Sequence, residues 1–397
     1  MDELSDLTVI IPTYERHSHV QRAIRYWNDL GVVIHVWDGS AEPLEHASLL
    51  DSPRLSYHHT PQFSMVERLR DACDHIETDY CCLIGDDEFH LRSGMLACLQ
   101  HLNEDRDLVA CLGRTLAFKS ESGELLARTH YAGMAGKSVA GSSSRARMIA
   151  HLENYLPSTI YAVTRTPVWQ KAMRAATAEA FPVFAIAELQ FEAAVAYQGK
   201  SKVIDVLHWL RNTHVPPTKE GDSSLITRKR FFEWWDDAQS SAERRRFLEV
   251  LARELGEGQE VQSPDEIKQE IAAAFSAYVR CIQDRSNARL AQRDETKSAK
   301  TTALRSDPAP VVQKASRHGV VGLLGRFGAV LRGVKPVIAH QPEPIETPKS
   351  TLAEIPPSAK RFAPFFETVR AVQQEGVSVN MDELKGVQNK LRGATDL

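Results

Sequence analysis

The sequence predicts a three-layer α/β domain over residues 1–215, followed by a mostly helical extension. Short apolar runs rich in β-branched residues alternate with helical patterns up to residue 215, as in domains built on a parallel sheet. Several of these runs stop abruptly at proline or at a polar cluster, which is typical of strand ends. Beyond Pro216 and Pro217 the apolar residues follow helical spacing instead.

The expected strands are the apolar runs at 7–11, 32–37, 80–84, 108–113 and 203–210. The first stops at Pro12, the second at Asp38-Gly39-Ser40 and the third at Gly85-Asp86-Asp87-Glu88. Strands that each stop at a polar cluster place those clusters along one edge of the sheet. In open α/β sheets the carboxyl ends of the strands are where ligands bind, so we expect the functional site at this edge.

Between the strands, apolar residues recur at the spacing of one helix face. The expected helices lie at 18–29, 64–76, 93–103, 145–155 and 188–197. Residues 133–144 are mostly small, and we expect a mobile lid or a linker there.

The extension begins with two helical patterns, at 228–255 and 263–293, and the second opens with the capping-box sequence Ser263-Pro264-Asp265-Glu266. A polar, linker-like stretch follows at 294–315, and a Pro/Glu tract at 341–357 precedes a short amphipathic tail. We therefore divide the chain into an α/β domain, a helical extension, a linker with a basic glycine-rich segment and a helical tail, at 1–215, 216–295, 296–357 and 358–397.

The segment 317–338 is apolar, basic and rich in glycine. Anionic lipid attracts such segments by about 1 kcal/mol per basic residue, which predicts peripheral contact with a membrane surface. Its first four glycines fall at every third residue, which predicts close packing against a partner or within the chain instead. Both interpretations stay open.

Composition and charge argue against several classes of protein. The 397 residues are 43% apolar and 25% charged, so a sizeable core is expected. The net charge of −4 argues against nucleic acid as a partner. The acidic start argues against a signal peptide. The sequence contains no run of 18 apolar residues, so we expect no membrane span. Five of the six cysteines fall between residues 73 and 111 without CxxC spacing, so we expect buried, reduced thiols in a cytoplasmic protein.

The triplet Asp86-Asp87-Glu88 carries the strongest chemical signal. A carboxylate cluster directly after a buried strand is too costly to be unpaired core. Carboxylates within one turn repel one another unless a cation lies between them. Oxygen ligands on a short loop suit Mg²⁺ or Mn²⁺, and the alternative is a solvated acidic turn.

The residues around this triplet resemble those of family 2 glycosyltransferases, which have the GT-A fold. Residues 8–16 (TVIIPTYER) resemble the family's opening strand and loop, and Asp38-Gly39-Ser40 resembles its second-strand Asp-Gly-Ser. Residues 85–89 (GDDEF) resemble the loop with the DxD-type motif, and residues 187–211 resemble the acceptor side. The resemblance covers about residues 7–215, with the four motifs in the family's order.

The resemblance implies a nucleotide-diphosphate sugar as donor and a Mn²⁺ or Mg²⁺ ion that neutralises its diphosphate. Asp86, Asp87 and Glu88 would form the metal site, with Glu88 as main ligand and Asp86 on the ribose or the metal. The other nucleotide-binding residues would be Pro12, Thr13, Tyr14, Glu15, Asp38 and Arg68. Asp38 would accept a hydrogen bond from the base. The alternatives are a simple turn for Asp38, an ordinary loop for residues 12–15 and a solvated helix face for Arg68.

An inverting transferase also needs a base that takes the proton of the acceptor hydroxyl. By resemblance this base is Glu188, with Glu192 one turn later as the fallback. The alternative is an exposed first-turn glutamate that the helix dipole favours. Arg211 and His214 follow the last expected strand, where some transferases of this fold close a basic residue or histidine over the pyrophosphate. The pairs His58-His59 and His17/His19 have no matching pattern and are treated as surface residues.

These observations predict a metal-dependent, inverting glycosyltransferase of cell-surface or lipid-linked glycan synthesis, with a glycan or lipid-linked acceptor. It would work in the cytoplasm or at the inner face of the plasma membrane. The alternative is a non-catalytic, transferase-like scaffold that binds a nucleotide or a glycan.

Overall fold

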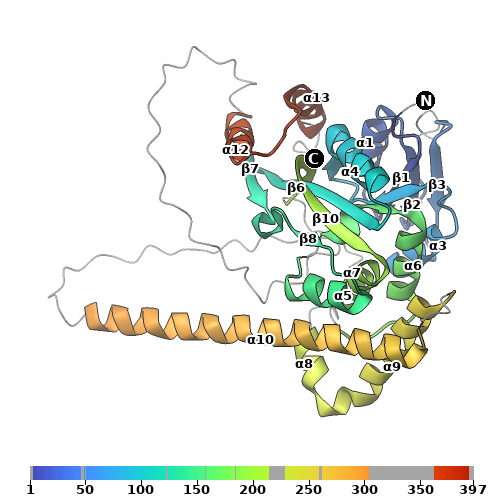
Figure 1. Ribbon diagram of the computed structural model, residues 1–397. Coiled ribbons are helices and arrows are strands. Elements are labelled where there is room, and N and C mark those ends of the chain that lie inside the picture. Colours follow the sequence, from blue (N-terminus) through green and yellow to red (C-terminus); the bar gives the residue numbers. More distant parts are fainter. Residues whose placement is uncertain are drawn as a thin grey trace.

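A computed structural model describes residues 3–45, 49, 51–121, 124–156, 158–183, 185–213, 229–258, 262–303 and 362–392. These residues form a ten-stranded mixed sheet flanked by helices, with further helices in the C-terminal part (Figure 1). The predicted α/β class with a helical C-terminal part is confirmed.

The strands follow the order β3-β2-β1-β4-β9-β6-β10-β5, with β7 beside β6 and β8 beside β10. Their bounds are β1 Leu7–Thr13, β2 Val33–Asp38, β3 Leu55–His59, β4 Tyr80–Leu83, β5 Phe89–His90, β6 Leu108–Glu121, β7 Glu124–His130, β8 Ser138–Val139, β9 Val163–Arg165 and β10 Lys200–Asn212. The helices are α1 His17–Asn28, α3 Met65–Ala72, α4 Arg92–Glu104, α5 Ser144–Glu153, α6 Thr166–Thr177, α7 Ile186–Gln198, α8 Phe231–Asp236, α9 Ser241–Gly256, α10 Pro264–Ala303, α12 Ala363–Gln374 and α13 Met381–Arg392.

Strand direction decides which loops meet. β1 lies between β2 and β4 and is parallel to both. β9 is antiparallel to β4 and β6, and β10 is parallel to β6. The carboxyl ends of β1, β2, β4, β6 and β10 therefore lie along the same edge of the sheet, as the polar ends of the first three strands predicted.

Several elements differ from the sequence-based expectation. β6 continues past residue 113 because its second half pairs with β7 and with β10, and Arg114, which breaks the apolar run, forms an ion pair with Asp205 of β10 at 3.0 Å. β9 is only three residues long, and neither it nor α6 was predicted. Residues 138–139, expected in a mobile lid or linker, pair with β10 as β8. Residues 294–303, expected as linker, continue α10 because many of them are good helix formers.

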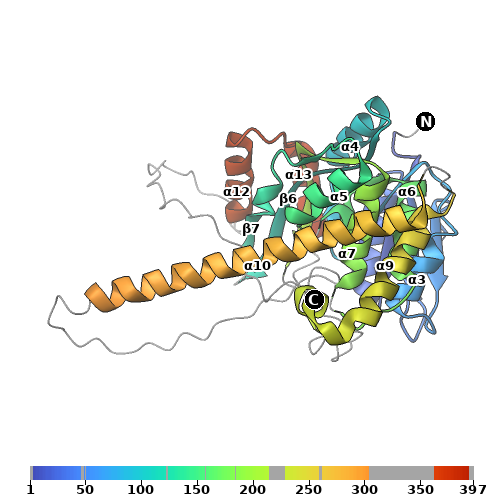
Figure 2. The ribbon, with the colours of Figure 1, turned by 60° about the horizontal axis from the view of Figure 1, so that its bottom comes forward.

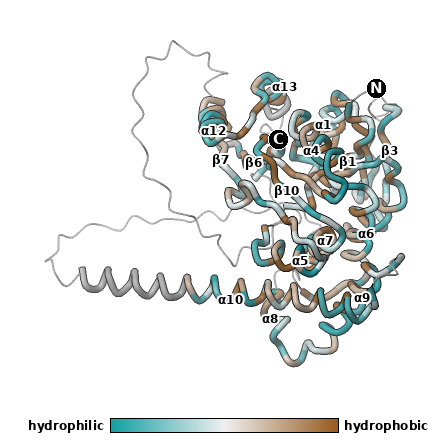
Figure 3. The backbone as a smooth tube through the Cα atoms, in the orientation of Figure 1, coloured by the Kyte–Doolittle hydropathy of each residue, from teal (hydrophilic) through white to brown (hydrophobic). Residues whose placement is uncertain are grey.

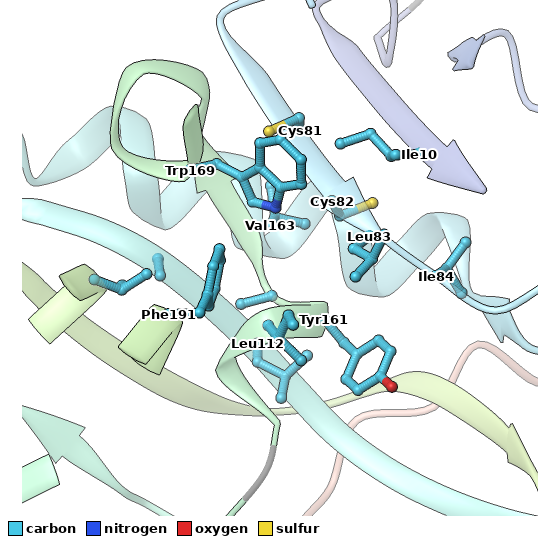
Figure 4. Close-up of a cluster of buried hydrophobic side chains, with 14 of the residues drawn as sticks. Ile10, Cys81, Cys82, Leu83, Ile84, Leu112, Tyr161, Val163, Trp169 and Phe191 are labelled. Carbon is cyan, nitrogen blue, oxygen red and sulfur yellow. The ribbon is translucent and has the colours of Figure 1, made fainter. Parts of the chain in front are cut away.

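The core lies where α6 and α7 cover the central strands. Trp169 of α6 and Phe191 of α7 meet at a ring-centroid distance of 6.4 Å, and Trp169 lies beside Cys81 of β4 and Val163 of β9 (Figure 4). Apolar residues gather on the central strands and polar residues on the outer faces of the helices (Figure 3). All five cysteines between residues 73 and 111 are buried and free, as predicted.

The helical part packs onto the α/β domain and shares its hydrophobic core. α10 contacts α5 and α9, and its C-terminal half extends well beyond the sheet (Figure 2). α12 lies against β7. No helix within the described ranges is both long and apolar enough to cross a bilayer. The segment 317–338, with its two open interpretations, lies outside the described residues.

Candidate active site

Three loops meet at the carboxyl edge of β1, β2 and β4. Thr13, the last residue of β1, donates a hydrogen bond from Oγ1 to Oδ2 of Asp86 at 2.6 Å. The carbonyl of Thr13 accepts from the backbone N–H of Gly39 at 3.1 Å. Thr13 therefore joins the loop of residues 85–88 after β4, called the acidic loop below, to the turn after β2.

Arg16 lies between two carboxylates of the acidic loop. Its Nη1 is 3.2 Å from Oδ1 of Asp86 and its Nη2 is 2.8 Å from Oδ2 of Asp87. Burial alone would lower the pKa of Arg16, but the two carboxylates outweigh it and raise that pKa. Asp86 is 1% exposed, so the alternative of a solvated acidic turn is wrong for this residue. No motif in the sequence predicted a role for Arg16, although it is the cation that follows the first strand.

Glu15 links the loop after β1 to the turn after β2 through hydrogen bonds. Its backbone is left-handed, with φ 52°, a conformation that costs about 1–2 kcal/mol for a non-glycine residue. Its N–H donates to Oγ of Ser40 at 2.7 Å, and its Oε1 accepts from the N–H of Ala41 at 2.8 Å. Pro12 and Thr13 are buried behind it, whereas Tyr14 is half-buried. The nucleotide-binding role of this loop stays a prediction.

Asp38 is buried and hydrogen-bonded through both oxygens. Oδ1 accepts from the N–H of Ser40 at 2.8 Å, which closes the Asp-Gly turn, and Oδ2 accepts from the hydroxyl of Tyr57 at 2.7 Å. His17 Nε2 lies 3.4 Å from the same Oδ2. The turn given as the alternative is therefore present, and a contact with a nucleobase stays a prediction.

Arg68 is buried, with 1% of the residue exposed, so the alternative of a solvated helix face is wrong. Its Nη1 donates to the carbonyl of Phe63 at 2.9 Å. The guanidinium lies directly on Gly39, where an added Cβ would be 1.6 Å from Nη1. A cation is thus held against the turn after β2, next to Asp38.

Of the histidines expected on the surface, His58 and His59 are partly buried beside the strand that ends at this turn. His59 Nε2 lies 2.8 Å from the carbonyl oxygen of Ser40. His58 stacks on His35 at a centroid distance of 5.6 Å, and burial lowers the pKa of both to about 4. These contacts were missed because β3, which carries His58 and His59, was not predicted as a strand.

Glu88 has different partners from the other two carboxylates. Its Oε2 accepts a hydrogen bond from Nε1 of Trp209 at 3.0 Å, and its Oε1 is 3.5 Å from Nε of Arg211. Burial raises the pKa of Glu88 to about 8, although Arg211 opposes the shift. Across the described ranges, no three His, Cys, Asp or Glu side chains converge as metal ligands.

Arg211 is enclosed by aromatic rings. Its guanidinium lies 5.2 Å from the ring centroid of Trp209 and 5.6 Å from that of Tyr131, whose hydroxyl accepts a hydrogen bond from Nη1. Tyr131 has a left-handed backbone, with φ 52°. His214, named together with Arg211 from the sequence, lies outside the described residues.

Glu188 is buried at the start of α7, with 2% of the residue exposed. The alternative of an exposed first-turn glutamate is therefore wrong. Its Oε1 accepts a hydrogen bond from the hydroxyl of Tyr155 at 2.5 Å. Burial raises the pKa of Glu188 to about 8, and the charge of Arg211 opposes the shift. Glu88 and Glu188 thus both lie within the electrostatic reach of Arg211.

Glu192, the fallback base, has a partner on each oxygen. Oε2 is 2.6 Å from Nε2 of His151, and Oε1 accepts from the N–H of Ile160 at 3.1 Å. His151 also lines a cavity of about 20 Å³ between β6, β10 and α5. A cavity of this volume holds about one water molecule. These contacts indicate that Glu192 holds α7 against α5 and the 159–161 turn.

Comparisons with known proteins find structural likeness only. No protein-family model matches the sequence, and no curated protein matches it. Among solved structures, Staphylococcus aureus TarS (residues 1–349) is similar with a TM-score of 0.41 and 11% identity, over 68% of this chain and 71% of that one. The same protein with UDP-GlcNAc gives a TM-score of 0.40 and 14% identity, over 68% and 72% of the two chains. With UDP it gives 0.38 and 10%, over 71% and 91%. At these values we draw no functional argument from the likeness.

Proposed function

We propose that this protein is a glycosyltransferase of the family 2 type, which moves a sugar from a nucleotide-diphosphate sugar to an acceptor hydroxyl. One observation carries the proposal: Thr13 and Arg16 both contact Asp86 at the carboxyl edge of the parallel strands. This edge is where open α/β sheets bind ligands. The loops that meet there, after β1, β2 and β4, are the loops that the sequence predicted at this edge.

The donor would lie over the half-buried rim formed by Tyr14, Arg16 and Asp87. Its diphosphate would find cations in Arg16 and in Arg68, which packs on the turn after β2. The ring of Tyr14 offers a face for the base.

A divalent cation fits two of the three carboxylates. Asp86 and Asp87 already converge on one cationic group, the guanidinium of Arg16. Mg²⁺ is commonly held by one or two carboxylates together with substrate phosphates. We therefore propose Asp86 and Asp87 as the residues that would hold Mn²⁺ or Mg²⁺, and leave Glu88 to Trp209 and Arg211. When bound, such an ion neutralises the charge of the leaving diphosphate.

Glu188 is proposed as the base. In a single displacement the acceptor oxygen bonds to the anomeric carbon while its proton passes to the Glu188 carboxylate. The bond from the anomeric carbon to the diphosphate oxygen breaks, and its electron pair leaves with the nucleoside diphosphate. A base with a pKa near the working pH serves this step best, and burial brings the pKa of Glu188 to about 8. The hydrogen bond from Tyr155 orients the carboxylate.

Calorimetric titration with UDP, GDP, dTDP and their sugars, with and without Mn²⁺, tests the donor site. We expect one nucleotide to bind in a metal-dependent way and Asp86→Asn to lose most of this binding. Asp74→Asn, at an exposed carboxylate paired with Arg174, is the matched control. Absence of binding to every nucleotide by the folded protein would refute the proposal. Binding without release of nucleoside diphosphate from any donor would favour the non-catalytic scaffold.

A further inference from the structure

The start of α4 is held by a residue 291 positions further along the chain. Leu91, the residue before the helix, has no side-chain oxygen to accept from the first-turn amides, which have no partner within a helix. The carboxylate of Glu383 in α13 supplies this cap. Oε1 accepts from the N–H of Arg92, and Oε2 accepts from the N–H of Ser93 at 3.1 Å.

The segment that carries Glu383 also completes the edge of β10. The pairing of β10 with β6 is irregular between Val203 and Leu207. At that irregularity Ser378 donates to the carbonyl of Asp205 at 2.8 Å and accepts from the N–H of Leu207 at 2.8 Å. β8 pairs with β10 before this point and β5 pairs after it. Ser378 therefore fills the interval between two short edge strands.

Buried side chains hold the same segment to the domain. Its inward-facing apolar residues are fully buried, and they are Phe365, Val369, Val372, Val377 and Leu384. α12 lies beside β7 (Figure 1), and Thr368 Oγ1 donates to the carbonyl of Ala127 at 3.1 Å. Arg114 is shared between Asp205 of β10, at 3.0 Å, and Glu375, at 3.8 Å.

The C-terminal segment contacts α4 and β10, and these are also the two elements that hold Glu88 of the acidic loop. Only β5 and Leu91 separate Glu88 from the start of α4. β10 supplies Trp209 and Arg211, the two partners of Glu88. The N–H of Leu91 donates to the carbonyl of His208 in β10 at 2.7 Å. The chain that follows Glu88 and the strand that supplies its partners are thus both fixed against the C-terminal segment.

We infer that residues 362–392 position the acidic loop, and that Glu383 is the positioning residue through which they do so. Fixing the start of α4 holds β5 in register on β10, and β5 holds Glu88 on Trp209 and Arg211. The consequence for donor binding rests on the proposed function, whereas the consequence for the acidic loop does not.

Hydrogen exchange of the full-length protein tests the inference, with Glu383→Ala compared with Glu383→Gln. Asp382→Ala, at the exposed neighbouring carboxylate, is the matched control. In Glu383→Ala we expect about tenfold faster exchange at the first amides of α4. This loss of protection should spread to the amides of Glu88 and Leu91 while those of β7 stay protected. Glu383→Gln keeps one acceptor oxygen and should restore part of the protection, and Asp382→Ala should resemble the wild type.

Nucleotide titration of the same variants separates the two proposals. If the wild type binds a nucleotide, Glu383→Ala should bind it about three- to tenfold more weakly. The denaturant concentration at which β7 and α12 unfold should stay the same. Faster exchange confined to the first turn of α4, or unchanged exchange there, would overturn the inference whether or not a nucleotide binds. If no nucleotide binds to the wild type, the proposed function fails, and the exchange of Glu88 and Leu91 still decides the positioning role.

Discussion

The carboxylate of Glu88 lies 3.5 Å from the guanidinium of Arg211, and both side chains are almost completely buried. Arg211 also donates to Tyr131 and lies on the ring of Trp209. Removing one member of such a buried group leaves its partners without compensation in a medium of low dielectric constant.

Arg211→Met should therefore lower the free energy of unfolding by about 1–3 kcal/mol, because Glu88 and Tyr131 lose a buried polar partner. Urea unfolding followed by circular dichroism measures this change. Arg25→Met, at an exposed position of α1, is the control and should stay within about 0.5 kcal/mol of the wild type. Equal values for the two variants would show that the pair contributes nothing.

Glu188→Gln should flatten the pH dependence of stability. Burial raises the pKa of Glu188 to about 8, from 4.5 for an ordinary glutamate. Between these values the native state keeps a proton that the unfolded state releases, so stability falls as the pH rises. The fall is at most about 1.4 kcal/mol per pH unit for one such carboxyl.

Unfolding in urea from pH 5 to 8.5 measures the slope, with Glu104→Gln, at an exposed residue, as control. Glu88→Gln should also flatten the curve, because burial raises the pKa of Glu88 as well. Parallel curves for Glu188→Gln and the wild type would mean that Glu188 is ionised in the native state near pH 6.

If the protein transfers sugars, Glu188→Gln should lower kcat by about 10²–10⁴-fold and leave donor affinity unchanged. In the wild type kcat/KM should rise with pH and level off above about pH 8, because the base must be ionised. Release of nucleoside diphosphate from the donor found by titration measures both. Loss of turnover in Glu192→Gln, with Glu188→Gln still active, would assign the base to Glu192 instead.

Gly39→Ala should displace Arg68, since the added Cβ would lie 1.6 Å from Nη1. We expect a loss of about 1–3 kcal/mol of stability from overpacking, together with weaker donor binding. The double variant Gly39→Ala/Arg68→Ala removes the clash and should be no less stable than Arg68→Ala alone. Gly386→Ala, where no atom lies near the added Cβ, should be neutral or stabilising. A stable Gly39→Ala variant with normal donor binding would argue against a role for Arg68 there.

The elements that the sequence predicted are those with a clear local pattern. Continuous apolar runs that end at Pro12, Asp38 and Gly85 predicted β1, β2 and β4, and with them the edge where the loops meet. β9 was missed because three residues carry no periodicity. The second half of β6 was missed because Gly113 and Arg114 interrupt the apolar run, and its partner strand β7 was not predicted.

The contacts within the site were harder to predict. The link from Arg16 to Asp86 spans some 70 residues, and the burial of Asp38 depends on Tyr57 of the next strand. Motifs predicted which residues lie near one another. They did not predict which carboxylate has which partner, because those choices depend on side-chain directions that only the packed sheet determines.

The cap on α4 has a consequence for how this protein is made. Arg92 precedes its partner Glu383 by 291 positions, so at about 5–20 residues per second a ribosome needs roughly 15–60 s to synthesise the intervening chain. During that time the α/β domain can collapse, but its acidic loop borders a helix whose first amides are still bonded to water. The nascent domain is thus complete only when Glu383 has emerged.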